Sequence, residues 1–167
     1  MHVTIRKAGH SDLADILGIY AYAREQMRRN GNPTQWGSSQ PSQEILTEDI
    51  NNGNLYVICG NGQTGGVFAF LTGDEPTYQV IEGSWLNDLP YGTLHRVAGN
   101  GTVCGVVERC IAYCGSICPN IRVDTHERNA VMRHLLEKNG FTECGIIYVR
   151  DHSPRIAYQR LIKYESE

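Results

Sequence analysis

The feature that most constrains the fold is a strand, a glycine-rich turn and a long helix in direct succession. Thr93–Ala98 has the alternation of a strand, and the turn "AGNGTVCGVV" follows it. From Val103 to Cys118 the apolar residues recur along one helical face. Ile121–Thr125 then reads as another strand. A strand that returns to its sheet through a helix lies parallel to its neighbour, with a right-handed crossover. The centre of the chain therefore predicts a sheet with parallel strands.

The other segments predict a mixed α/β domain around this crossover. Ser11 and Ser42 are candidate N-caps of two early helices, and "GNG" at Gly60–Gly62 marks a hairpin turn. The remaining predicted elements are strands at His2–Arg6, Leu55–Cys59, Gly66–Leu71, Glu143–Val149 and Ile156–Ile162, and a helix at Asn129–Lys138. No repeat or linker appears, so residues 1–167 are predicted to form one domain.

Charge and hydropathy exclude some classes of protein. The net charge of -3 implies no general affinity for nucleic acid. No apolar run approaches membrane-spanning length, and the first residues lack the apolar core of a signal peptide. These features predict a cytoplasmic protein that binds neither nucleic acid nor membrane.

The six cysteines show no pattern of a metal site or a disulfide framework. Cys110, Cys114 and Cys118 follow one helical face, whereas Cys59 and Cys144 lie in strand-like runs. There is no C-x-x-C and no neighbouring pair of histidines, which a zinc site would need. The cysteines are therefore interpreted as small buried thiols in a reducing compartment, and no metal is expected.

The glycine-rich turn is a candidate cradle for a pyrophosphate. Gly99, Gly101 and Gly105 would let backbone amides approach a ligand closely, and the N-terminus of a helix attracts anions. The turn lacks the G-K-[ST] of a P-loop, and it does not match the Rossmann G-x-G-x-x-G. An ordinary tight turn is the alternative interpretation.

The glycine turn and the segment "NAVMRHLLEKNGF" together resemble the GNAT family of acetyl-CoA-dependent N-acetyltransferases. The ending "EKNGF" is similar to the family signature "LYEKxGF", and the order of elements agrees over nearly the whole chain. The resemblance implies a splayed mixed β-sheet of about seven strands flanked by about four helices. It also implies that acetyl-CoA enters a V-shaped opening between the central strands, and that a free amine attacks the thioester directly.

The resemblance also assigns residues to the cofactor. Val97 and Ala98 lie on the strand whose backbone would pair with the pantetheine amides, and Asn129 matches the family asparagine that hydrogen-bonds the cofactor. Asn129 is equally suited to cap its helix, and both roles can hold. A rival position for the family's pyrophosphate motif, Arg96–Gly101, would begin inside the strand. The motif Q/R-x-x-G-x-G/A is therefore placed on Thr102, Val103, Cys104, Gly105, Val106 and Val107.

The family's usual proton donor is missing, because Leu136 occupies the position of its tyrosine. Tyr148 and His95 are candidate replacements, and the alternatives are a strand aromatic and a packing histidine. Glu82 is a candidate base, because it lies in the irregular segment before the cofactor strand. A solvated carboxylate is the alternative interpretation of Glu82.

The acceptor is predicted to be the amine of a small molecule or a peptide. Trp36, Tyr78 and Trp85 lie in irregular segments and suggest an aromatic-lined acceptor pocket, unless they only pack loops onto the core. Two other functions stay open at this point: a catalytically silent module that binds or senses acyl-CoA, and a nucleotide-binding α/β domain. The sequence also leaves open whether the chain forms a homodimer.

Overall fold

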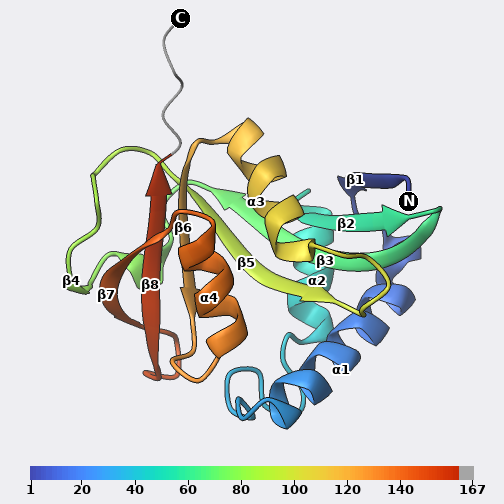
Figure 1. Ribbon diagram of the computed structural model, residues 1–167, viewed down its shortest axis with the longest axis horizontal. Helices are drawn as coiled ribbons and strands as arrows, with labels where there is room; N and C mark the ends of the chain where they lie inside the picture. The colour runs from blue at the N-terminus through green and yellow to red at the C-terminus, as the bar shows by residue number, and fades with distance from the viewer. Residues whose placement is uncertain (162–167) are drawn as a thin grey trace, which may run out of the picture. The chain divides into compact units, whose positions relative to one another are not determined.

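The computed structural model of the protein describes residues 1–161 and has a mixed α/β fold (Figure 1). Within these residues there are eight strands and four α-helices. The chain divides into two compact units: Met1–Phe70 with His95–Cys110, and Leu71–Leu94 with the residues from Ile111 onward. The predicted fold class is confirmed, with eight strands rather than about seven. A single domain over residues 1–167 stays a prediction.

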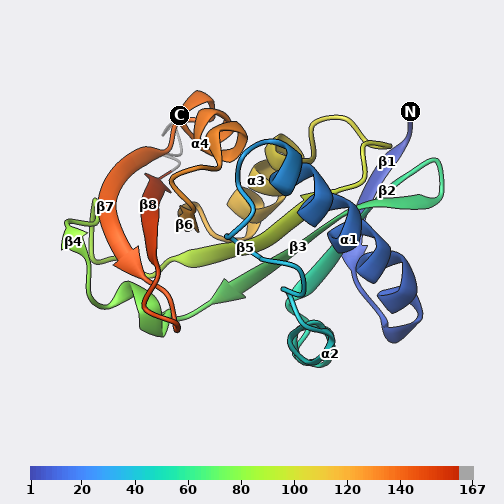
Figure 2. The same cartoon turned by 90° about the horizontal axis from the view of Figure 1, so that it is seen from below.

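The first unit is built on β1, β2 and β3, which pair antiparallel in that order. Its strand order is β1-β2-β3-β5, and β5 enters it at His95. Figure 2 shows α2 on one side of these strands and the start of α3 on the other. The elements are β1 Val3–Lys7, α1 Leu13–Arg29, α2 Gln43–Asn51, β2 Leu55–Gly60, β3 Gln63–Thr72, β5 Gly92–Gly99 and α3 Val106–Ile117.

Local signals explain most boundaries in this unit. Asn61 and Gly62 have positive φ angles of 52° and 80°, so the predicted turn closes the β2–β3 hairpin. Ser42 caps α2 as predicted, since its hydroxyl accepts a hydrogen bond from the Ile45 N–H at 3.3 Å. Ser11 as N-cap of α1 is wrong. Residues His10–Asp12 form a 3₁₀ turn instead, and the Asp12 carboxylate accepts from the Gly9 N–H at 2.8 Å.

The start of α3 corrects another prediction. The helix begins at Val106 rather than Val103, because Gly105 has a φ of +69° and interrupts the helical conformation. Val103 belongs to the preceding loop, where its side chain is buried. An apolar residue in phase with the helical stripe therefore extended the predicted helix too far.

The second unit has the strand order β5-β6-β8-β7-β4. Its β5 residues Gly92 and Thr93 pair in parallel with Ile121 and Arg122 of β6, which confirms the parallel neighbours predicted from the crossover. Helix α4 covers one face of β6 and β8 (Figures 1 and 2). The remaining elements are η2 Pro76–Tyr78, β4 Glu82–Gly83, β6 Asn120–Thr125, α4 Ala130–Lys138, β7 Thr142–Tyr148 and β8 Pro154–Leu161. The last residue of the predicted final strand, Ile162, lies outside the described residues.

A short edge strand was missed by the sequence analysis. β4 pairs with β7 through Glu82↔Ile146 and Gly83↔Gly145. Two residues show no alternation, so this strand is defined only by its partner far along the chain. The other face of the second unit's sheet is covered by Tyr78 and Tyr91, which pack with Ile147 and Ala157.

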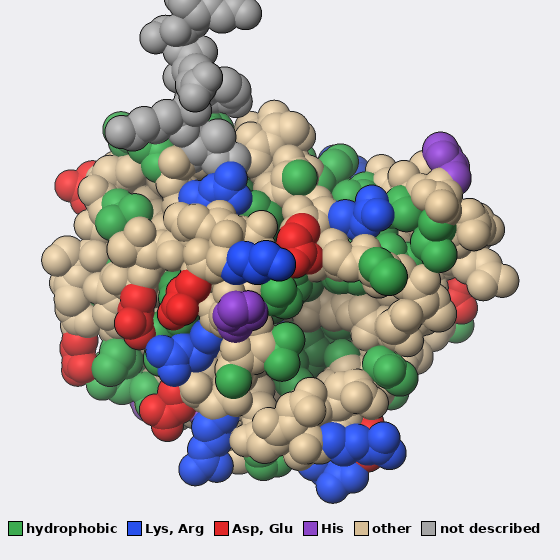
Figure 3. Space-filling view, viewed as in Figure 1, with side chains coloured by type: hydrophobic (Ala, Val, Ile, Leu, Met, Phe, Trp, Pro, Cys, Tyr) green, Lys and Arg blue, Asp and Glu red, His purple; other side chains and the backbone are tan. Residues whose placement is uncertain are grey.

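On the face shown in Figure 3, basic and acidic side chains are interspersed. Among residues 1–161, no helix combines the length and apolar character needed to cross a membrane, and no three His, Cys, Asp or Glu side chains gather as a metal site would need. All six cysteines are free. Cys59, Cys110 and Cys114 are buried as predicted. The prediction is wrong for Cys104, which is exposed in the loop before α3, and for Cys118 and Cys144, which are half-buried.

Candidate active site

The predicted phosphate loop is held against β3 by Asn100 and Gly65. The Asn100 N–H donates to the Gly65 carbonyl at 3.1 Å. Its side-chain Oδ1 accepts from the Thr102 N–H at 3.1 Å and from the Thr102 hydroxyl at 2.6 Å. A Cβ atom at Gly65 would lie 2.5 Å from Thr102 Oγ1 and 2.6 Å from Val103 Cγ2. The loop can therefore rest on β3 only because residue 65 is glycine.

The loop ends at the N-terminus of α3. Gly105, at φ +69°, immediately precedes the helix, and its carbonyl accepts the Arg109 N–H at 3.0 Å. The N–H groups of Val106 and Val107 belong to the first turn, which has no preceding carbonyls to bond. The chosen position of the pyrophosphate motif therefore ends where a helix presents free amides. In the rival position, Arg96 to Gly99 lie within β5.

Gly99 has a packing role. A Cβ atom there would come within 3.0 Å of Val106 Cγ2, so the glycine lets the first residue of α3 pack on β5. Packing therefore accounts for the glycine at position 99 without any ligand. A Cβ atom at Gly105, in contrast, would have no neighbour closer than 3.6 Å, so no packing contact requires a glycine there.

A basic side chain lies at the same loop, and the sequence analysis missed it. Arg109 donates from Nε to the Cys104 carbonyl at 3.0 Å and is otherwise exposed. Its guanidinium therefore sits beside the loop that precedes α3. The signal in the sequence was a basic residue at the beginning of the helix that follows the glycine turn.

Strand β5 carries His95, Val97 and Ala98, as predicted. Ala98 is buried, and the other two are half-buried. Between His95 and Val97 lies Arg96 at φ +53°, a left-handed conformation that is rare for a residue with a side chain. No residue type in the sequence predicts this departure from regular strand geometry.

In the second unit, Asn129 caps α4. Its Oδ1 accepts a hydrogen bond from the Met132 N–H at 3.1 Å, and the helix begins at Ala130. The capping role is therefore confirmed. A hydrogen bond from Asn129 to the cofactor stays a prediction.

Two of the three aromatic residues predicted for the acceptor pocket lie together. The rings of Tyr78 and Trp85 have centroids 5.0 Å apart, and Trp85 Nε1 donates to the Tyr78 carbonyl at 2.9 Å. Trp36 belongs to the first unit and packs edge-on against Tyr20, with centroids 5.5 Å apart. Trp36 therefore has a packing partner of its own within that unit.

Tyr78 and Trp85 line a cavity of about 460 Å³ in the second unit. Arg122 also lines it, with its guanidinium 4.2 Å from the Trp85 ring centroid and 4.0 Å from that of Tyr91. Arg122 is only 6% exposed, and its Nε has no hydrogen-bond partner among the described residues. The full lining is Gly73, Asp74, Tyr78, Gln79, Trp85, Asp88, Leu89, Pro90, Tyr91 and Arg122. The sequence signal for this site was an arginine inside an apolar strand.

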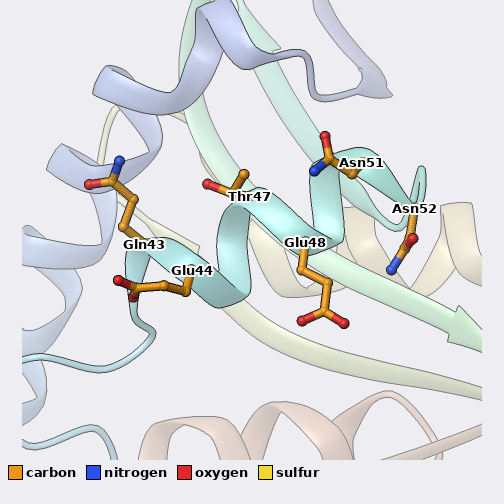
Figure 4. Close-up of a pocket in the computed structure, with 6 residues that line it drawn as sticks. All are labelled: Gln43, Glu44, Thr47, Glu48, Asn51 and Asn52. Atoms are coloured by element: carbon orange, nitrogen blue, oxygen red, sulfur yellow. The ribbon is translucent and has the colours of Figure 1, made fainter.

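A second hollow, of about 480 Å³, follows the outer side of α2 (Figure 4). Its side chains all come from this helix and the turn after it, and they are polar or acidic. A solvated row of this kind is what a surface helix normally presents, so no acceptor is assigned to it. The lining residues are Gln43, Glu44, Thr47, Glu48, Asn51 and Asn52.

Comparison with known proteins decides the family. No protein-family model matches the sequence, and neither does any curated protein. The solved structure of a GNAT-family acetyltransferase from Streptococcus agalactiae, however, is 31% identical with a TM-score of 0.83, and the match covers 97% of this chain and 96% of that one. The chain belongs to the GNAT acetyltransferase family. It is therefore an acyltransferase.

More distant acetyltransferase structures support the same fold. A GNAT-family acetyltransferase from Listeria monocytogenes is 18% identical with a TM-score of 0.71, covering 96% of this chain and 95% of that one. A ribosomal-protein-alanine N-acetyltransferase from Brucella melitensis is 18% identical with a TM-score of 0.63, covering 95% and 99%. At this identity the two structures bear on the fold alone.

In this GNAT protein, a buried leucine occupies the position of the family's tyrosine. Leu136 on α4 is fully buried, and its carbonyl accepts the Phe141 N–H at 3.0 Å where the helix ends. A leucine side chain has no proton to give. Any specific proton donor must therefore come from another element.

The two residues predicted as acid and base meet in the second unit. The Tyr148 hydroxyl donates to Glu82 Oε1 at 2.9 Å, and Tyr148 is 41% exposed. The pKa of Tyr148 is raised, mainly because its proton is shared with the Glu82 carboxylate. Tyr148 therefore stays protonated across the neutral range.

Another tyrosine, which the sequence analysis missed, lies beside α4. The hydroxyl of Tyr158 accepts from Arg133 Nε at 3.0 Å. Burial raises the pKa of Tyr158, and the Arg133 side chain opposes the shift. Tyr158 is therefore a second hydroxyl held in place in this unit.

Proposed function

We propose that this GNAT acyltransferase moves an acetyl group from acetyl-CoA to a primary amine of a small molecule or a peptide. The observation that carries the proposal is the loop before α3, in which Gly105 leads directly into a helix N-terminus with Arg109 beside it. Backbone amides, a helix dipole and a guanidinium together suit the pyrophosphate of coenzyme A.

Three elements are proposed to bind different parts of the donor. The loop and the first turn of α3 would hold the pyrophosphate, the backbone of β5 would pair with the pantetheine, and the amide of Asn129 on α4 would add a hydrogen bond. The residues assigned to the donor are Val97, Ala98, Thr102, Val103, Cys104, Gly105, Val106, Val107, Arg109 and Asn129.

The proposed reaction is direct aminolysis of the thioester. The amine nitrogen forms a bond to the acetyl carbon, the carbon–sulfur bond breaks, and the coenzyme leaves as a thiolate. The amine loses one proton and the thiolate gains one. Glu82 is proposed to accept the proton that the amine loses. Tyr148 or His95 is proposed to supply the proton that the thiolate gains. No residue here requires a metal.

The cavity lined by Trp85 and Arg122 is proposed to bind part of the acceptor. Asp74 and Asp88 bring negative charge to it, which suits an ammonium group, and its aromatic rings suit an apolar chain. Tyr78 lines the same cavity, and Trp36 remains a proposed contact of the acceptor. We also propose a cytoplasmic enzyme that binds neither nucleic acid nor membrane, in agreement with its free thiols and with the charges of both signs on the face shown in Figure 3. A homodimer would be compatible with this activity.

One observation favours a second function. Because the buried Leu136 replaces the usual tyrosine, the chain could bind acyl-CoA without turnover, as a sensing module. Release of thiol from acetyl-CoA with a panel of amines, diamines, aminoglycosides and short peptides separates the two functions. Binding of acetyl-CoA without any acceptor-dependent thiol release would support the sensing module.

Acetyl-CoA is expected to stabilise the fold. A ligand that binds only the native state adds about 2.7 kcal/mol at a hundredfold excess over its Kd. The thermal unfolding midpoint should therefore rise with acetyl-CoA, and the rise should be larger than with ATP at the same concentration. An unchanged midpoint with acetyl-CoA would refute the donor, and a rise with ATP alone would favour a nucleotide-binding domain.

A further inference from the structure

Strand β5 contains one residue in a conformation that regular strands do not adopt. Arg96 has a φ of +53°, although it is neither glycine nor asparagine. Such a residue persists only when its surroundings hold it, and left-handed residues of this kind cluster at functional sites. The contacts of Arg96 therefore show what holds it.

Two buried side chains hold Arg96, one at its backbone carbonyl and the other at its guanidinium. The hydroxyl of Tyr20 on α1 donates to the Arg96 carbonyl at 2.6 Å, and Tyr20 is fully buried. The carboxylate of Asp49 on α2 binds the guanidinium, with Oδ2 at 2.9 Å from Nε and 2.7 Å from Nη2. Asp49 is also buried. Both helices thus converge on a single residue of β5.

The contact with Tyr20 sets the direction of a peptide group. In a planar trans peptide, the carbonyl and the N–H point in opposite directions. Because the Arg96 carbonyl points to Tyr20, the N–H of Val97 points away from α1. The left-handed residue and its two anchors therefore decide where the backbone donor at Val97 is aimed.

Stability alone is a weak reason for this arrangement. A buried ion pair is often no more stable than apolar residues of the same volume, because desolvation offsets the attraction. The pair between Asp49 and Arg96 is better explained by the strand conformation that it imposes.

We propose that Asp49 and Tyr20 are positioning residues for acyl transfer, which act by holding Arg96 left-handed and so orienting the β5 backbone at Val97. The inference rests on the proposed function, in which the acyl donor lies along Val97 and Ala98. Neither side chain needs to touch the donor, since both act through Arg96.

The test compares substitutions that each remove one anchor. Tyr20→Phe deletes only the hydroxyl, and Asp49→Asn deletes only the charge. A small misplacement at a reacting centre costs on the order of 10²-fold in rate, so each variant should lower kcat by about ten- to a hundredfold. The Kd for acetyl-CoA should change much less, because the proposed phosphate contacts at the α3 loop are untouched. Asp49→Glu, which keeps the charge, should recover part of the loss.

A matched control separates positioning from general stability. Asp12→Asn breaks another ion pair of the same unit, in which the Asp12 carboxylate lies 2.8 Å from the Arg6 guanidinium and which does not involve β5. This variant should lower the unfolding midpoint and leave kcat unchanged when assayed well below that midpoint. All variants are compared under that condition.

The pH profile of kcat gives a readout that a merely structural role would not move. Burial raises the pKa of Asp49, and this outweighs the opposing effect of Arg96. The other charged or titratable groups acting on this carboxylate are His95 and Glu48, and it in turn acts on Tyr20. As the pH falls through the raised pKa, Asp49 protonates and releases Arg96. The wild type should lose kcat on this acidic side, and Asp49→Asn should lack that limb.

Several results would overturn the proposal. If Tyr20→Phe and Asp49→Asn both fold and keep wild-type kcat and pH profile, Arg96 needs no anchors for the reaction. If Asp12→Asn lowers kcat as much as Tyr20→Phe and Asp49→Asn do, the anchors are structural. A wild type that neither binds acetyl-CoA nor transfers its acetyl group would refute the proposed function itself, and the inference with it.

Discussion

Gly105→Glu is expected to lower the affinity for acetyl-CoA by about a hundredfold or more while the chain still folds. A carboxylate at this point would face the phosphates that are proposed to bind at the N-terminus of α3. A close pair of like charges costs several kcal/mol, and each ~1.4 kcal/mol raises the Kd tenfold. Gly105 lies in a loop with no neighbour closer than 3.6 Å to a Cβ atom, so the side chain has room. Titration calorimetry with acetyl-CoA measures the change.

Two other glycines provide the controls. Gly62 has a similar φ of +80° in the β2–β3 turn with open space around it, so Gly62→Glu introduces the same charge and strain away from the loop. Its affinity should match the wild type. Gly101→Glu tests the rival position of the motif, Arg96–Gly101. If Gly101→Glu abolishes binding while Gly105→Glu retains it, the rival position is right.

Tyr148→Phe is expected to lower kcat by about 10²–10⁴-fold, the usual contribution of a general acid. The phenol is held by Glu82 at 2.9 Å and stays protonated in the neutral range, so it can give its proton to the departing thiolate. The Kd for acetyl-CoA should not change. Steady-state kinetics with the best acceptor, together with a binding measurement, checks both parts.

Three companion variants make this result specific. Tyr113→Phe on α3 removes a hydroxyl that has no proposed role and should keep the wild-type rate. His95→Ala and Tyr158→Phe examine the other candidate donors in the same assay. A thiol has a pKa of about 8.5, so thiolate is a fair leaving group without help. Full turnover in Tyr148→Phe, His95→Ala and Tyr158→Phe alike would mean that water supplies the proton.

The parts of the fold that follow local rules could be predicted from the sequence. The crossover through α3 was visible because a long apolar stripe joins two strand-like runs. The caps at Ser42 and Asn129 were visible because each side chain bonds an N–H three residues ahead. The start of α3 was misplaced, because Val103 fits the stripe while contacts near Gly65 hold it in the loop.

The parts that depend on long-range contacts could not be predicted in this way. Strand β4 exists through its pairing with β7, and the Tyr148–Glu82 hydrogen bond joins residues 66 positions apart. The left-handed conformation of Arg96 depends on anchors from two helices, which no local pattern encodes.

Some residues of the candidate site could likewise be predicted from the sequence, and others could not. The glycine loop could be predicted from its residue types. Arg109 is a candidate only because its guanidinium donates a hydrogen bond to the Cys104 carbonyl. Tyr78 and Trp85 meet because they lie close in sequence across a turn. Trp36 has its contact with Tyr20 instead.

Acetyl transfer is tested most directly by the mass of an amine after incubation with acetyl-CoA and the wild-type chain, with Gly105→Glu as the matched negative. At least one primary amine of the panel should gain the mass of one acetyl group, in equal amount to the coenzyme A thiol released. The product should resist hydroxylamine, as an amide does and an ester does not, and Gly105→Glu should form far less of it. Tight binding of acetyl-CoA that leaves every amine unmodified would refute the proposed acetyl transfer, as would equal product from both chains.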